Sequence, residues 1–220
     1  AINFLIDQKK APTDDVSICL LQALKSQAGS KTSRKTQRSF GGLRRLLSHT
    51  NPTIARLAIE NLGAWKAPKA RPQLVALLKS DHHSMEVRQA ASIALVKLGQ
   101  NVSDLEALAN GPDLSNRYAA VPGLITADLA IGIESTVDLL ANDPGELDPI
   151  SILQIILKNR RGSRLLASQL KGKPIHSAVV SRVGEFHRTT GQLPREIVPY
   201  FQPSPDNKNS LTDRLLTEDQ

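Results

Sequence analysis

The sequence predicts an all-α fold, a right-handed superhelix of about five or six stacked helical hairpins. One pattern occurs three times, in residues 51–58, 84–90 and 114–119, and each copy opens an apolar, helix-like run. An arginine recurs in the copies at intervals of roughly thirty residues, as Arg56, Arg88 and Arg117. Aromatic residues make up only 3% of the chain, so Leu, Ile, Val and Ala must form the core, as closely packed thin helices require.

The first two helices are predicted on either side of a polar loop. Acidic residues follow Pro12 in a first helical turn, where they favour the helix dipole, so a helix should extend to about Ala28. Residues 29–36 are polar and should form an exposed loop. Apolar residues then recur at helical spacing from Phe40 to about His49.

The clearest helical pair follows Asn51. Asn51 is a favourable N-cap, and Pro52 suits the first position of a helix. Residues 66–72 contain two prolines and should end this helix. The apolar face comprises Ile54, Leu57, Ala58 and Leu62, and a short partner helix contains Leu74, Leu77 and Leu78.

Two more pairs follow from the same reasoning. A long helix should run from Met85 to Leu98 and stop at Gly99, with a short partner over 102–108 and small alanines that permit close packing. A third long helix over 115–129 contains Pro122-Gly123, which should kink or break it. Residues 133–140 form its predicted partner.

The C-terminal part is less regular. Residues 150–157 are rich in β-branched side chains and could form a buried strand, but the repeat context favours a helix. Further helices are expected at 164–170, 175–186 and 194–201. We expect residues 1–202 to form one helical repeat domain and residues 203–220 to form a polar linker or tail.

The formal charge of +7 is distributed unevenly. No Asp or Glu occurs between Asp15 and Glu60, or between Asp148 and Glu185, and such basic stretches attract anionic partners. The candidate binding surface consists of Arg56, Arg88, Arg117, Lys35, Arg38, Arg44 and Arg45.

Two interpretations of Arg56, Arg88 and Arg117 are open. In the favoured one, each arginine pairs with an acid or a helix end of a neighbouring repeat; in the other, the three line a concave face that grips phosphate or carboxylate. Nucleic-acid binding would also favour aromatic residues for base stacking. Trp65, the single indole, is expected to pack within a hairpin instead.

The sequence contains little that points to catalysis. The single cysteine, Cys19, excludes an internal disulfide and is expected to be a small core residue. His82 and His83 are adjacent, so their side chains should diverge into solvent rather than bind a metal. No nucleophile elbow, phosphate-binding loop or long apolar span is present. We therefore expect no enzyme, cofactor, membrane span or small-molecule substrate.

The helical pairs with openings such as Glu86-Val-Arg-Gln-Ala-Ala91 resemble HEAT repeats. Segments 17–40, 51–80 and 164–175 are also similar to the HEAT-like region of large planctomycete and verrucomicrobial proteins. Those proteins typically join a dehydrogenase-like β-propeller, the helical region and a cytochrome c domain. The resemblance implies a spacer or docking module that is exported to the cell envelope, but the Cys-x-x-Cys-His haem motif of that family is absent here.

The expected function is therefore a non-catalytic scaffold for protein–protein or interdomain interaction. The alternative is a nucleic-acid-binding module of HEAT type that uses the basic surface. A lyase of HEAT-like type is a third possibility, for which no residue can be nominated. The chain begins at Ala1 without an initiator methionine, so we read it as a fragment or processed product. The resemblance implies a periplasmic or envelope location, with the cytoplasm as the alternative.

Overall fold

The computed structural model describes residues 13–28, 40–99 and 102–202. All regular secondary structure in these ranges is helical, and they contain no strand, which confirms the predicted all-α class. The chain divides into two compact units, residues 1–135 and 136–220. Because each unit is described by itself, the expectation of a single repeat domain over 1–202 stays a prediction.

The first unit alternates long and short helices. The long helices are α1 (Asp14–Ser26), α3 (Pro52–Ala64), α5 (Met85–Lys97) and α7 (Leu114–Ala127). The short elements are α2 (Gly41–Arg45), η2 (Leu46–Ser48), η3 (Pro68–Ala70), α4 (Arg71–Leu78) and α6 (Val102–Ala109). Helix α8 (Leu129–Asn142) runs across the boundary between the units.

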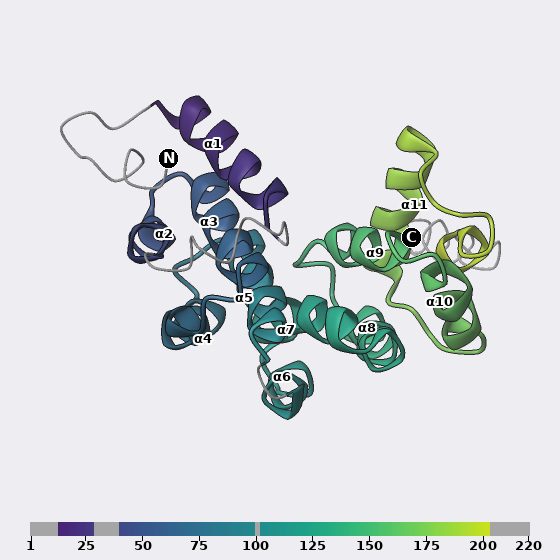
Figure 1. The fold of residues 1–220 in the computed structure, drawn as a ribbon. Coiled ribbons are helices and arrows are strands. Elements are labelled where there is room, and N and C mark those ends of the chain that lie inside the picture. Colours follow the sequence, from purple (N-terminus) through teal and green to yellow (C-terminus); the bar gives the residue numbers. More distant parts are fainter. Residues whose placement is uncertain (1–12, 29–39, 100–101, 203–220) are drawn as a thin grey trace, which may run out of the picture. The chain divides into compact units, whose positions relative to one another are not determined.

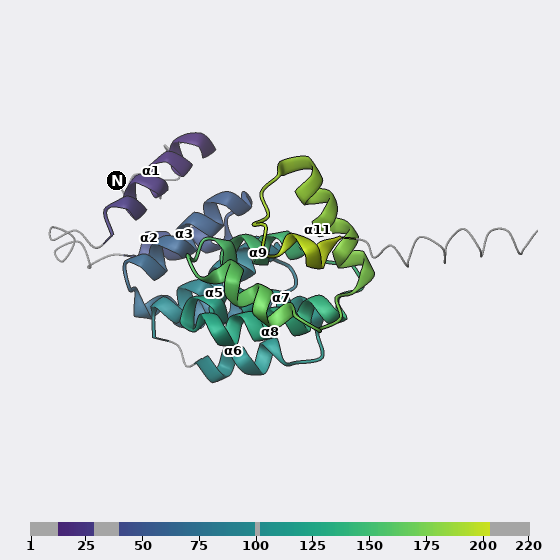
Figure 2. The ribbon, with the colours of Figure 1, turned by 90° about the vertical axis from the view of Figure 1, so that its right-hand side faces the viewer.

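The long helices form a row in chain order. Helix α3 packs between α1 and α5, and α5 packs between α3 and α7 (Figure 1). The short helices lie along this row, with α2 against α3, α4 against α5 and α6 against α7. The view in Figure 2 agrees that α1 occupies one end of the row. The predicted stack of helical hairpins is thus confirmed in this unit.

Hydrogen bonds show that neighbouring long helices are parallel. At the start of α3, Asn51 Nδ2 donates to Asp14 Oδ2 at 2.7 Å, at the start of α1. At the other end, Trp65 Nε1 donates to the carbonyl of Leu24 at 3.2 Å. Helices α5 and α7 are likewise joined near their starts, because Arg88 donates to Asn116 Oδ1 at 2.6 Å. The row therefore has one edge of helix N-termini and one edge of C-termini.

Helix α3 illustrates how local sequence and packing agree. Asn51 caps it, with its side chain accepting from the N–H of Thr53 at 2.9 Å, and Pro52 occupies the first position. Its predicted apolar face is buried. Gly63 permits close contact with α5, since a Cβ at Gly63 would lie 2.9 Å from the Cα of Ala94. These observations confirm the predicted cap and the close approach through small residues.

Helix α7 continues through Pro122. Of the predicted kink or break, the break is therefore wrong, and the kink stays a prediction. Proline has no backbone N–H, so Pro122 cannot donate the helical hydrogen bond to the carbonyl of Tyr118. Gln89 of α5 supplies a donor instead, because its Nε2 lies 3.3 Å from that carbonyl oxygen. Packing against the neighbouring helix therefore compensates for the local loss.

The second unit contains α9 (Pro149–Leu157), α10 (Gly162–Leu170), α11 (Ser177–Thr190) and η4 (Val198–Phe201). Helix α9 packs against both α10 and α11, and α11 also contacts η4. Helix α9 confirms the helical interpretation of 150–157. The helix expected at 194–201 is only a short 3₁₀ turn, because Pro199 removes a backbone donor from the segment.

Cys19 is exposed, so its assignment to the core is wrong. Helix α1 lies at the end of the row and buries only the face with Ser17 and Leu21. Cys19 is two positions from each, which turns it about 200° around the helix axis, toward the side opposite α3.

Candidate functional site

Arg88 is a core residue, with only 2% of its side chain exposed. Its Nε donates to the carbonyl of Leu78 at 3.0 Å, at the end of α4. One terminal nitrogen donates to Asp81 Oδ1 at 2.9 Å and to Ser115 Oγ at 2.6 Å, and the other donates to Asn116 Oδ1. Arg88 thus joins α4, α5 and α7, and its guanidinium is not on a binding surface.

Arg117 occupies the equivalent position of the next repeat. Arg88 and Arg117 are both the fourth residue of a long helix. The Nε of Arg117 donates to the carbonyl of Ala109 at 2.9 Å, at the end of α6, just as Arg88 Nε does at the end of α4. A cationic donor at a helix C-terminus satisfies an orphan carbonyl and opposes the negative end of the dipole. This geometry supports the structural interpretation of both arginines.

Arg56 does not share this position, because it is the fifth residue of its helix. It pairs within the helix instead, with a terminal nitrogen 2.7 Å from Glu60 Oε1. Lys25 of α1 reaches the other oxygen of the same carboxylate, also at 2.7 Å. Burial would raise the pKa of Glu60, but the hydrogen bonds and charges of Lys25 and Arg56 together hold its pKa below the ordinary value.

The other basic candidates are not gathered into one site. Lys35 and Arg38 lie outside the described residues. Arg44 and Arg45 end helix α2, where cations favour the helix dipole; Arg45 is exposed and Arg44 is half-buried.

Most exposed charges at the two edges of the row differ in sign, with Asp128 after α7 and Lys79 after α4 as exceptions. Exposed lysines lie at or just beyond the C-terminal ends of α1, α3 and α5, and we name this set the basic edge: Lys25, Lys66, Lys69 and Lys97. Exposed acids gather near the N-terminal ends: Asp14, Asp15, Asp81, Glu86 and Asp113. Both placements favour the aligned helix dipoles, and together they give the first unit a positive and a negative side.

Two described residues, Ala28 and Phe40, lie close to the basic edge. The backbone N–H of Ala28 donates to the carbonyl of Lys25. The ring centre of Phe40 lies 6.0 Å from that of Trp65, at the end of α3. Trp65 is buried, with 8% of its surface exposed, so the predicted packing role of the indole is confirmed.

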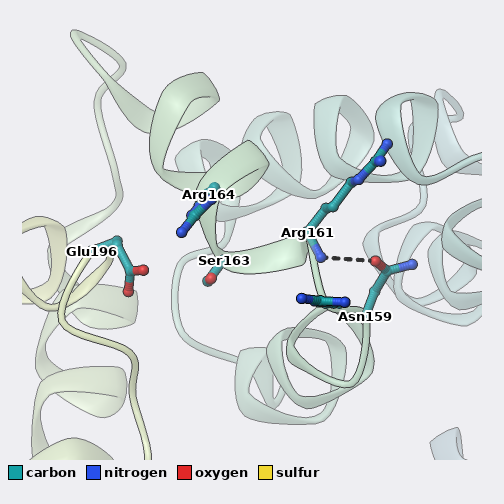
Figure 3. Close-up of a pocket in the computed structure, with 6 residues that line it drawn as sticks. Asn159, Arg161, Ser163, Arg164 and Glu196 are labelled. Atoms are coloured by element: carbon teal, nitrogen blue, oxygen red, sulfur yellow. Dashed lines mark hydrogen bonds between the residues drawn. The ribbon is translucent and has the colours of Figure 1, made fainter.

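A basic pocket lies in the second unit, around the turn between α9 and α10. It has a volume of about 670 Å³ and is lined by Asn159, Arg160, Arg161, Ser163, Arg164 and Glu196. Figure 3 shows Ser163 and Arg164 between Glu196 on one side and Asn159 on the other, while the side chain of Arg161 extends away from Ser163. The backbone N–H of Arg161 donates to Asn159 Oδ1 at 3.1 Å, which stabilises the turn.

Our candidate residues did not include this pocket, although the sequence carries a signal for it. The segment Asn159-Arg-Arg-Gly-Ser-Arg164 lies within an acid-free stretch of the chain. Glu196 comes from more than thirty residues further along, so the sixth lining residue is visible only in the fold.

The described part of the chain contains no group of three or more His, Cys, Asp or Glu side chains that could hold a metal ion. No helix among these described residues is both long and apolar enough to cross a bilayer.

Comparison with known proteins agrees with the helical row. Residues 42–125, from α2 through most of α7, match the family model for HEAT repeats. The helical row of the first unit is therefore similar to HEAT repeats. No curated protein and no solved structure matches the chain significantly. Families of HEAT type are generally non-catalytic, and such stacked repeats present extended surfaces for other proteins.

Proposed function

We propose that the HEAT-repeat unit is a non-catalytic scaffold that binds an acidic protein surface or domain through the basic edge. The proposal rests on one observation: the conspicuous polar and aromatic side chains inside the row contact neighbouring helices, whereas lysines at its edge are exposed. Arg88 and Arg117 hold helices together, and Trp65 packs against Phe40, so these residues are occupied structurally. Lys25 pairs with Glu60, so Lys66, Lys69 and Lys97 are the exposed lysines of the basic edge that we assign to partner recognition.

A protein partner fits this edge better than a nucleic acid. Proteins that bind single strands stack bases on exposed aromatic side chains. In the described part of the first unit, Trp65 and Tyr118 are buried and Phe40 is half-buried. The basic edge therefore offers charge without a stacking platform. Lys35, Arg38, Arg44, Arg45 and Arg56 remain further candidates for contributing positive charge to partner binding.

The proposal is tested by capture with the full chain from a nuclease-treated lysate. The variant Lys66→Glu/Lys69→Glu/Lys97→Glu reverses three charges of the basic edge. The control Lys158→Glu/Lys171→Glu/Lys173→Glu reverses three exposed lysines of the second unit. We expect the wild type and the control to capture the same protein and the edge variant to lose it. Equal capture by the edge variant would contradict the proposal.

Retention on immobilised DNA tests the alternative function. A nucleic-acid-binding module should bind DNA and release it steeply as salt rises, because phosphate contacts release counterions. Capture that disappears after nuclease treatment, together with such a salt profile, would favour that alternative. Weak retention already lost at low salt favours the protein scaffold.

We further propose that this chain belongs to a larger exported protein of the propeller and cytochrome type. Support comes from the resemblance of segments 17–40, 51–80 and 164–175 to the helical region of such proteins. In that setting the scaffold would position neighbouring domains in the cell envelope. The genomic sequence around this chain tests the idea. An export signal upstream and a haem motif downstream are expected, whereas a cytoplasmic reading frame without either would contradict it.

A further inference from the structure

The pocket of the second unit concentrates positive charge. Three arginines and one glutamate line it, which gives the lining a formal charge of +2. All four of these charged side chains are exposed. No ion pair involves Arg160, Arg161 or Arg164 within the described ranges, which do contain ion pairs of three other basic residues. Like charges that line one pocket repel one another, and an anion bound there would reduce that repulsion.

We propose that this pocket binds the phosphate monoester group of a small ligand. Arg160 and Arg164 supply guanidinium donors to the lining. Ser163 adds a hydroxyl beside Arg164 (Figure 3). Guanidinium groups bind phosphate oxygens through short, charge-assisted hydrogen bonds that are about twice as strong as neutral ones. Because the side chain of Arg161 extends away from Ser163, it contributes mainly to the surrounding field.

The charge of the pocket favours a monoester over other anions. A phosphate monoester carries about −1.5 to −2 at neutral pH and so matches the lining charge of +2. A carboxylate or a nucleic-acid phosphodiester carries only a single charge per group. None of the described residues that line the pocket is aromatic, so none of them can stack a base. The volume of about 670 Å³ lies within the range of small-molecule sites.

The direct test is a titration of the isotopically labelled full chain, followed by backbone amide chemical shifts. The probes are O-phosphoserine, serine and inorganic phosphate, at constant ionic strength. We expect O-phosphoserine to produce saturable shifts in residues 159–164 and serine to produce none. Shifts with inorganic phosphate alone show that the free ion suffices; stronger binding of O-phosphoserine shows that the ester is recognised.

Variants assign the binding to the pocket. Arg164→Gln and Arg160→Gln should each weaken O-phosphoserine binding about ten-fold, because each removes a charge-assisted hydrogen bond. Glu196→Gln should strengthen it a few-fold, because the variant removes the negative charge of a described lining residue. The matched control Arg188→Gln removes an exposed arginine of α11 outside the pocket and should leave binding unchanged.

The pH dependence provides a second readout that folding defects cannot imitate. The second pKa of a phosphate monoester is about 6, so binding should strengthen as the pH rises from about 5 to 7.5. Absence of saturable shifts at 159–164 overturns the proposal. Equal weakening by Arg188→Gln overturns it too. Tighter binding of a single-stranded oligonucleotide to the same amides also overturns it, and favours a nucleic-acid site.

Discussion

Arg88 joins neighbouring helices and does not face a partner, because its side chain is buried. Its guanidinium donates to the end of α4 and to two side chains at the start of α7. Arg117 repeats the contact to a helix end, whereas Arg56 lies one position further along its helix and pairs with Glu60. A shift of one position along the sequence turns a side chain about 100° around the helix axis. The arginines at the fourth position therefore bond to a neighbouring helix end, whereas Arg56 at the fifth position forms an ion pair within its own helix.

Arg88→Lys should destabilise the chain by about 2 kcal/mol, because one ammonium group cannot satisfy acceptors on three elements. Urea unfolding measures this loss. The control Arg56→Lys, at a half-exposed ion pair, should cost less than about 0.5 kcal/mol. Equal losses for the two variants would show that Arg88 does not join the helices.

Glu60 links stability to pH. Its pKa is lowered in the folded chain, against the effect of burial, by Lys25 and Arg56. A lowered pKa contributes stability above the unfolded value of 4.5, and the contribution is lost as pH falls through the folded pKa. As the pH falls from 6 to below the folded pKa of Glu60, the free energy of unfolding should therefore decrease more for the wild type than for Glu60→Gln. Urea unfolding at a series of pH values measures this difference. Parallel profiles for the two proteins would contradict this.

At the scale of helices, close packing depends on small residues and on donors supplied by neighbours. Gly63 brings α3 against the backbone of α5 at Ala94, and Gly123 brings α7 near Ser92 of α5. Gln89 donates to the carbonyl that Pro122 leaves without its helical partner. Helices α5 and α7 are therefore matched to each other, beyond the general fit of apolar faces.

Gly63→Ala should destabilise the chain by about 1–3 kcal/mol, because the added Cβ meets helix backbone that cannot rotate away. Thermal and urea unfolding both report the change. The control Gly41→Ala places a Cβ in open space at the start of α2, and it should be neutral or slightly stabilising. A stabilising Gly63→Ala would indicate that helix propensity outweighs the packing contact.

Gln89→Leu should cost about 1–3 kcal/mol, because a buried carbonyl loses the donor that replaces the missing N–H. Pro122→Ala restores the backbone N–H of α7. In the background of Pro122→Ala, Gln89→Leu should therefore cost much less, and a double-mutant cycle measures this coupling. Additive losses would show that the two residues act independently.

On the scale of the whole molecule, each helical pair of the first unit depends on its neighbours. Helix α5 contacts α3, α4 and α7. Its apolar residues are therefore buried only when these neighbouring helices are present. Stability in such arrays arises from the interfaces between repeats as much as from the repeats themselves.

Deletion of residues 84–110 removes α5 and α6 and should abolish the cooperative thermal transition of the first unit, because α3 and α7 both lose their main neighbour. Circular dichroism on heating measures the transition. Deletion of 203–220, which the sequence predicts to be a polar tail, serves as the control and should leave melting unchanged. An unchanged midpoint after the internal deletion would contradict the interdependence of the repeats.

The positions of the helices were predictable because their signals are local. Asn51 and Pro52 start α3, and Gly99, with φ of +75°, follows the end of α5 in the left-handed conformation that glycine readily adopts. Periodic apolar residues identified the buried faces of the same helices. The sequence alone thus determined the all-helical class, the repeat and the ends of its clearest elements.

The tertiary structure decided what each side chain contacts, because that depends on neighbours distant in the sequence. Burial of Arg88, exposure of Cys19 and the continuity of α7 through Pro122 all follow from which helix lies alongside. The pocket is the same kind of case, since Glu196 joins the 159–164 turn only after the second unit folds. Caps and periodicity act within a few residues, whereas contacts between helices require the assembled chain.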